Sequence, residues 1–267
     1  MRLGARIAAI EFATNEVRLA VVKTGWKMPG LLECHACPVP ETTEEGRFQA
    51  WVEATRSVLA QVKSAPHAYV LCSDSLYAVV RVLTVPLKGR RKVGAAVRFE
   101  LEPYLAFPVE ELAVDHIPLR ETQEGTDVLT VGLRKALLQE QLAILSAAGV
   151  DPEGIGLDAA GLTALWLSGQ SSKGLSAQWH VRDGGSVLVM LHNSNPVFFR
   201  HLSIGGAQLH AAPAQAVREV ANSLRAFAAS WKGEEELPGL VVTGARLEEE
   251  EQRGFESILN LPVSCLE

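Results

Sequence analysis

The chain has 267 residues, of which 48% are hydrophobic and 21% are charged, and its formal net charge is -6. This balance is typical of a globular protein and excludes a disordered chain. The acidic net charge provides no general attraction to nucleic acid. Because no segment reaches the roughly 18 consecutive apolar residues that a membrane-spanning helix needs, the sequence predicts no such helix.

The spacing of apolar residues predicts an alternation of strands and helices over the first two thirds of the chain. Strands are expected at residues 7–12, 16–23, 30–38, 67–72, 77–83, 109–119, 128–133 and 155–157. Helices are expected at residues 48–63, 93–105, 135–148 and 158–167. Asp158 is well placed to cap the last of these helices.

A glycine- and serine-rich break at residues 169–174 is the expected boundary between two halves. Behind it, Asp183-Gly184-Gly185 opens an apolar strand, a polar turn at 193–196 reverses the chain, and a second strand runs over 197–202. Gly205-Gly206 then starts the next element. A helix at 214–231, a buried strand at 240–243 and a helix at 247–259 complete an α/β pattern with mixed sheets.

Cys34 and Cys37 form a C-x-x-C pattern, which invites a zinc or redox hypothesis. Zinc would need a second pair of ligands, and Pro38 and Pro40 exclude the helix that follows a redox C-x-x-C. We therefore expect reduced thiols in a strand of a cytosolic protein. The basic run at 88–92 is expected to be a solvated turn before a helix.

Four segments together resemble the actin-like ATPase fold, in the version found in PilM of type IV pili and GspL of type II secretion. Residues 183–206 are similar to its second phosphate hairpin. Residues 10–17 are similar to the first hairpin, with Glu11 in place of an aspartate and Ala13 in place of a glycine. Residues 241–246 are similar to the adenosine motif, with one glycine left. Residues 98–112 are similar to the signature of an inserted subdomain.

The resemblance implies an α/β, actin-like (ribonuclease H-like) fold of two halves, with a subdomain inserted as in FtsA rather than as in actin. The first half would span residues 1–174, with its core at 1–84 and 150–174 and the inserted subdomain at 85–149. The second half would span 175–267. A single helix is expected to follow Gly205-Gly206 almost directly, and this shortened second half resembles GspL more than a full PilM.

In the actin-like fold, backbone N–H groups of two hairpin turns hold the phosphates of a nucleotide, and an acidic residue in each hairpin holds the metal. The resemblance carries this role to Glu11, Thr14, Asn15, Asp183, Gly184, Gly185, Gly205, Gly206, Thr243 and Gly244. Three eroded motifs argue against tight ATP binding, since Ala13 and the single Gly244 deny a close approach of the backbone. We therefore expect no enzyme, no catalytic residue, no cofactor and no bound metal.

The resemblance implies a cytoplasmic scaffold, peripheral to the inner membrane, in a type IV pilus or type II secretion assembly platform. Its partners would be a PilN-like or GspM-like membrane protein and the assembly ATPase, with membrane contact only through partners or a removed C-terminal segment. Most of the apolar cluster in the inserted subdomain should be buried, and one or two members should stay exposed to anchor a partner. The partner-binding candidates are Phe99, Tyr104, Leu105 and Phe107.

Two alternatives remain open from the sequence. The first is a nucleotide-binding ATPase or nucleotide-gated switch of the same fold, which would use ATP and Mg²⁺. The second is an enzyme related to sugar or acetate kinases, for which the chain supplies no acidic base and substrate pocket together. Titration with ATP and Mg²⁺ would separate the scaffold from the switch.

Overall fold

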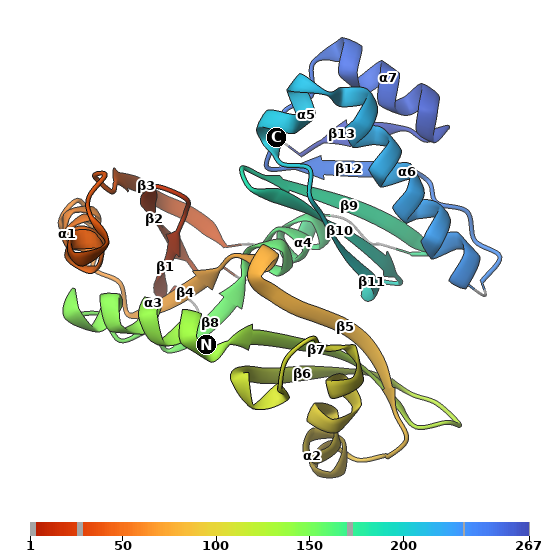
Figure 1. Ribbon diagram of the computed structural model, residues 1–267, viewed down its shortest axis with the longest axis horizontal. Helices are drawn as coiled ribbons and strands as arrows, with labels where there is room; N and C mark the ends of the chain where they lie inside the picture. The colour runs from red at the N-terminus through yellow and green to blue at the C-terminus, as the bar shows by residue number, and fades with distance from the viewer. Residues whose placement is uncertain (1–3, 26–28, 170–172, 232, 267) are drawn as a thin grey trace. The chain divides into compact units, whose positions relative to one another are not determined.

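The computed structural model describes residues 4–25, 29–169, 173–231 and 233–266 (Figure 1). These residues form three separate β-sheets, of five, five and three strands. No helix in these ranges is both long enough and apolar enough to cross a membrane. The middle of the expected boundary at 169–174 lies outside the described residues.

The contacts between residues divide the chain into two compact units. The first unit is Met1–Tyr77 with Arg134–Gly161, and the second is Ala78–Leu133 with Leu162–Glu267. The two five-stranded sheets belong to different units, and the three-stranded sheet belongs to the second. The expected division into halves at 1–174 and 175–267 stays a prediction.

The sheet of the first unit has the strand order β3-β2-β1-β4-β8. β1 pairs antiparallel with β2, and β2 with β3, whereas β1, β4 and β8 run parallel. Helix α1 contacts β2, β3 and α3. The bounds of these elements are β1 Arg6–Phe12, β2 Glu16–Lys23, β3 Gly30–Pro38, α1 Glu44–Ala60, β4 Ala68–Ser73, α3 Lys135–Ala147 and β8 Gly154–Leu157.

Glu33 ties the edge strand β3 to the segment that follows α1. The backbone N–H of Lys63 lies 3.0 Å from its Oε2 and that of Ser64 lies 2.6 Å from its Oε1, while Nε2 of His35 is 2.9 Å from Oε2. The Lys63 N–H above all, and then Ser64 and His35, lower the pKa of Glu33 from 4.5 to about 2. The ionised carboxylate therefore fastens this edge of the sheet.

Replacing Glu33 with glutamine should lower the melting temperature of the protein near neutral pH. Because the folded pKa of Glu33 is about 2 and its ordinary value is 4.5, the carboxylate stabilises the fold above pH 4.5, and this contribution is lost as the pH falls towards 2. Thermal unfolding at a series of pH values should show the gap between wild type and Glu33→Gln shrinking over that interval. A gap that does not change with pH would contradict this account, and Glu41→Gln, at an exposed loop position, is the control.

The three-stranded sheet has the order β5-β7-β6 and carries helix α2 on one face. Val93, Val97 and Leu101 of α2 are buried against Leu112 and Val128 of the strands. The helix ends earlier than expected, because the chain turns into a short 3₁₀ segment around Pro103. The bounds are β5 Ala78–Val85, α2 Arg90–Leu101, β6 Leu112–Glu121 and β7 Thr126–Arg134.

The second five-stranded sheet repeats the first. Its order is β11-β10-β9-β12-β13, with antiparallel pairing from β11 to β9 and parallel pairing from β9 to β13. The two five-stranded sheets therefore have the same plan. The bounds are α4 Asp158–Gly169, β9 Leu175–Arg182, β10 Gly185–His192, β11 Asn195–Leu202, α5 Gly206–Ala211, α6 Pro213–Ser230, β12 Leu240–Thr243, α7 Glu249–Leu259 and β13 Val263–Cys265.

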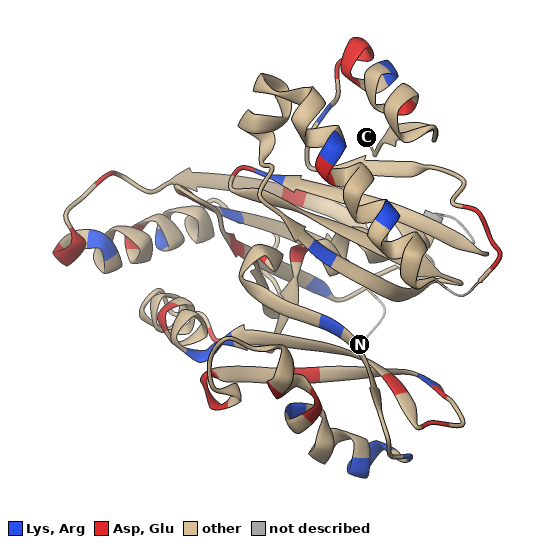
Figure 2. Cartoon of the chain, turned by 45° about the vertical axis from the view of Figure 1, so that its right-hand side comes forward, with Lys and Arg blue, Asp and Glu red and all other residues tan. Residues whose placement is uncertain are grey.

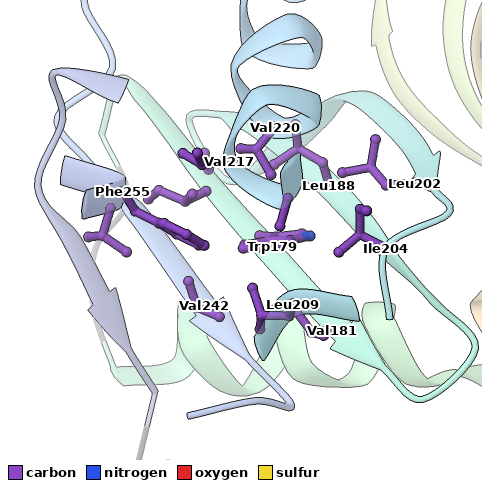
Figure 3. Packing of buried hydrophobic residues seen from close by; sticks show 14 of the residues in the cluster. Trp179, Val181, Leu188, Leu202, Ile204, Leu209, Val217, Val220, Val242 and Phe255 are labelled. Carbon is purple, nitrogen blue, oxygen red and sulfur yellow. The ribbon is translucent and has the colours of Figure 1, made fainter. Parts of the chain in front are cut away.

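Both faces of the central strand β9 are covered. Trp179, with no exposed surface, belongs to the core between this sheet and α5, α6 and α7, where it lies beside Phe255 (Figure 3). On the opposite face, Thr163 of α4 donates a hydrogen bond to Oε1 of Gln178 at 2.5 Å. A strand covered in this way has no exposed side, which accounts for its nearly complete burial.

Three details of the second half differ from the sequence predictions. Strand β9, which was not among the expected strands, precedes Asp183, so Asp183-Gly184 is the turn between β9 and β10. The turn between β10 and β11 is only Asn193-Ser194, both with positive φ, and β11 begins at Asn195 rather than at 197. A six-residue helix, α5, stands between Gly205 and α6, so the expectation of a single following helix is wrong.

Candidate functional site

The candidate phosphate-binding residues of the second half lie at one edge of its sheet. β9 and β12 are parallel neighbours, so their carboxyl ends meet at the same edge. β9 ends at Arg182 and continues into the Asp183-Gly184 turn, and β12 ends at Thr243 and continues into Gly244. In open α/β sheets, ligands bind outside the carboxyl ends of the strands.

Two glycines at this edge are required by close packing of the backbone. A Cβ at Gly205 would collide with the carbonyl oxygen of Asp183, and a Cβ at Gly244 would collide with that of Val181. Gly244 also has a φ of +79°, a conformation that favours glycine. The fold therefore joins Asp183, Gly205 and Gly244 in one region, as the resemblance implied for a nucleotide-binding edge.

His180 is a polar residue of this edge that sequence reasoning did not assign to the site. It is buried near the end of β9, and its Nδ1 lies 3.1 Å from Oγ1 of Thr243. Its ring also lies beside the position that a Cβ of Gly244 would occupy. The signal in the sequence was its place near the end of the run 175–182, in which apolar and polar residues alternate as in a strand.

One backbone donor just before α5 is already used within the protein. The backbone N–H of Gly205 donates to Oε1 of Gln208 at 3.1 Å. Gly206 begins the helix, and a Cβ there would meet no atom within 4 Å. Gly184 is equally open. Gly205 thus serves the packing of the turn, while Gly184 and Gly206 leave space around the backbone.

The first hairpin, formed by β1 and β2 in the other unit, turns at Ala13-Thr14-Asn15. The N–H of Ala13 donates to the carbonyl of Glu16 at 2.9 Å, and the carbonyl of Asn15 accepts from Val39 at 2.7 Å. Thr14 and Asn15 are exposed. The N–H of Ala13 is therefore engaged within the hairpin and is not available to a phosphate.

Glu11, the expected metal-binding carboxylate of this hairpin, lies beside an arginine. It is paired across the hairpin with Arg18, whose Nη1 is 3.8 Å from Oε2 of Glu11. Nε of Arg18 lies 2.6 Å from Oε1 of Glu16. A cation at Glu11 would meet this guanidinium, which opposes binding through like-charge repulsion.

A buried carboxylate that the sequence identified only as a helix cap is also part of the first unit. Oδ1 of Asp158 accepts from both the hydroxyl and the backbone N–H of Ser75, and Ala159 donates to it at 2.7 Å. These donors stabilise the charge of the buried group. They fasten the start of α4 to the segment after β4, so Asp158 is engaged in holding the fold.

The partner-binding candidates of the inserted subdomain differ in exposure. Leu105 and Phe107 pack against its core beside the fully buried Leu101. Phe99 is 72% exposed and Tyr104 is 59% exposed. Two aromatic side chains thus remain free at the surface, while the rest of the cluster holds the subdomain together.

The cysteines and histidines form no metal site within the described ranges, where no group of three or more His, Cys, Asp and Glu side chains converges. Cys34 and Cys37 are free thiols on the edge strand β3. Residues three apart on a strand point to opposite faces, so the two sulfurs cannot share a metal there. His192 pairs with Asn195, not with His201, across β10 and β11.

No protein-family model matches the sequence, and a search of curated proteins finds no match either. Solved structures do match. A chain of a PilM-PilN type IV pilus biogenesis complex is 19% identical, with a TM-score of 0.82 over 100% of this chain and 89% of its own. The cytoplasmic domain of EpsL, an inner membrane component of the type II secretion system of Vibrio cholerae, is 14% identical, with a TM-score of 0.56 over 91% of this chain and 84% of its own.

A Bacteroides thetaiotaomicron protein with an actin-like ATPase fold is 9% identical, with a TM-score of 0.60 over 99% of this chain and 91% of its own. At these identities the likeness concerns the fold. This likeness agrees with the two five-stranded sheets of the same plan and with the two hairpins at 10–17 and 183–206 that carry the resemblance. The chain has the actin-like ATPase fold, in a form similar to the PilM-PilN and EpsL structures.

Proposed function

We propose that this chain is a cytoplasmic scaffold of an inner-membrane assembly platform in a type IV pilus or type II secretion system. The observation that carries the proposal is the match over the whole chain to a PilM-PilN complex. The match to EpsL, an inner membrane component, adds support. The work of the protein would be binding, to a PilN-like or GspM-like membrane protein on one surface and to the assembly ATPase on another.

The exposed aromatic residues of the inserted subdomain are the proposed anchor for the membrane partner. Phe99 and Tyr104 offer large apolar surfaces with few rotatable bonds, a combination that is enriched at binding hot spots. Phe99 lies on α2 two residues before the buried Leu101, and Tyr104 directly precedes Leu105, which packs against the same core, so both are held on folded segments. A short hydrophobic segment of the partner would cover them on binding.

Tyr104→Ala should weaken binding of the partner's cytoplasmic segment by about tenfold or more, with almost no change in melting temperature. Tyr77, which is 64% exposed outside the inserted subdomain, provides the matched control, and Tyr77→Ala should bind normally. Binding can be measured by titration calorimetry with the segment of the membrane protein encoded beside this chain. If Phe99→Ala and Tyr104→Ala both bind like wild type, the proposed anchor is wrong.

We further propose that the protein is not an ATPase. Three features support this: Arg18 beside Glu11, the hydrogen bond that engages the N–H of Ala13, and the single glycine at 244. Calorimetry with Mg²⁺ and ATP should give weak or undetectable binding, and no phosphate should be released. Micromolar binding that Asp183→Ala abolishes would instead establish the nucleotide-gated switch as the function.

A further inference from the structure

A second surface, on the opposite side of the second sheet from α4, offers a groove that the proposed function does not use. It lies at the end of α6 and α7 and has a volume of about 750 Å³. Its apolar lining comes from the C-terminal half of α6, the loop before β12 and the end of α7. The residues that form this lining include Leu224, Trp231, Leu237, Ile258, Leu259 and Leu261.

The groove is open rather than enclosed. Ile258 is 52% exposed, and Leu224, Trp231, Leu237, Leu259 and Leu261 are partly exposed over a buried floor that includes Phe227. A small-molecule site usually buries most of its ligand, which this shallow surface does not. Exposed apolar residues gathered in one place and rimmed by charge are instead typical of a protein-binding surface.

The two rims carry opposite charges. Arg218 and Arg225 lie on α6, seven residues apart and therefore about 10 Å apart along one face of the helix. Glu235 and Glu236 line the other end, in the loop that follows α6. Figure 2 shows the blue bands along α6 and the red loop after it.

Both arginines are available to an acidic partner. Arg225 donates to Oδ1 of Asn222 at 2.6 Å, and no ion pair with a carboxylate is found for Arg218 or Arg225 in the part of the chain that the structure describes. Arginine on the rim of an apolar groove is a frequent binding hot spot. The rim formed by Arg218 and Arg225 therefore favours a partner that carries acidic residues beside an apolar stripe.

The backbone around the groove favours a helical occupant. Two of its walls are the helices α6 and α7, whose N–H and C=O groups are already paired within the helix, and its strand residues come from the central strands β9 and β10, so the groove offers no strand edge. An extended peptide would leave its own backbone groups unpaired against the apolar floor, which costs free energy. A helix satisfies its backbone internally and can present side chains at i, i+3, i+4 and i+7.

We propose that this groove binds an amphipathic helix of a partner protein, with an apolar stripe over Ile258 and Trp231 and acidic residues facing Arg218 and Arg225. The end of that helix nearest Glu235 and Glu236 carries a basic residue. This site is independent of the proposed anchor at Phe99 and Tyr104. Loss of binding at one site leaves binding at the other intact, so failure of the two proposals can be told apart.

The test is selection from a displayed library of helix-constrained peptides with randomised faces, because an unconstrained peptide of this length is only marginally helical. Wild-type protein should enrich peptides with apolar residues at helical spacing and acidic residues on one flank. The double variant Arg218→Glu with Arg225→Glu should enrich basic flanks instead and should bind the original peptides about tenfold or more weakly.

Two further variants locate the binding. Ile258→Asp should abolish capture of the selected peptides without lowering the melting temperature, since Ile258 is already half exposed. Arg200→Glu, at an exposed position on β11, should leave binding unchanged. The proposal is overturned if the enriched peptides do not carry apolar residues at helical spacing. It is overturned as well if the charge of their flank is the same for wild type and for the Arg218→Glu, Arg225→Glu variant. It is also overturned if sedimentation shows a homodimer that Ile258→Asp dissociates, because the groove then receives a second copy of this chain.

Discussion

Replacing Trp179 with alanine should destabilise the second unit by about 3–5 kcal/mol, the range for removing a large buried aromatic side chain. Trp179 has no exposed surface and is the largest side chain of the core formed with α5, α6 and α7. Its ring centroid lies 5.9 Å from that of Phe255, and its Nε1 donates to Oγ of Ser186 at 2.8 Å. The substitution therefore leaves a cavity and removes the donor to a buried hydroxyl.

A loss of this size is a large fraction of the roughly 5–15 kcal/mol by which domains are usually stable. Hydrogen exchange measured by mass spectrometry should show faster exchange in β9, β10 and β12, while β1 and β4 of the other unit keep their protection. Trp179→Phe is the matched control, because it keeps an aromatic ring next to Phe255 and loses mainly the hydrogen bond to Ser186. Equal loss of protection in both units would show that they unfold together.

The strands and helices with a regular apolar pattern were predicted from sequence to within a few residues. β12 was predicted over its full length, and α3 was one residue shorter than expected. Strand β9 was missed although polar residues, among them Gln178 and His180, alternate with Ala177 and Trp179, a period that is typical of a strand. That alternation would have indicated one exposed face, whereas the structure buries both.

The short elements were missed for a different reason. Helix α5 has six residues, fewer than two turns, and cannot show a helical period. At the tip of β10 and β11, Pro196 made the turn look longer than it is. The structure places the reversal in the two residues Asn193 and Ser194, whose φ values are 49° and 67°. Asparagine tolerates this left-handed conformation, whereas serine seldom adopts it.

The motifs named the residues of the candidate site, but they did not predict the contacts that bring these residues together. Asp183, Gly205 and Gly244 are separated in the chain. The antiparallel pairing of β10 with β11 brings Gly205 back to the Asp183 turn, and the parallel pairing of β9 with β12 brings Gly244 beside β9. The hydrogen bonds from Ser75 to Asp158 span 83 residues. Such contacts depend on tertiary packing, which local patterns do not encode.

Gly205 and Gly206 offer a sharp test of this assembly, because substitutions at the two neighbours should have opposite effects. Gly205 has φ -98° and ψ -179°, a conformation open to any residue, so its need for glycine comes only from the carbonyl oxygens of Arg182 and Asp183. Gly205→Ala should destabilise the second unit by about 1–3 kcal/mol, as overpacking usually does. Gly206→Ala meets no atom and should stabilise the helix start by up to about 1 kcal/mol.

Urea denaturation of the two variants measures these differences directly, and similar effects at both positions would mean that Gly205 is not pressed against the turn.

The same pair of variants also tests this edge of the sheet as a phosphate site. Gly205→Ala must displace the Asp183 turn to fit its Cβ, whereas Gly206→Ala leaves that turn in place. If wild-type protein shows any calorimetric signal with Mg²⁺ and ATP, Gly205→Ala should remove it and Gly206→Ala should retain it. Retention in both variants would place the nucleotide away from the Asp183 turn.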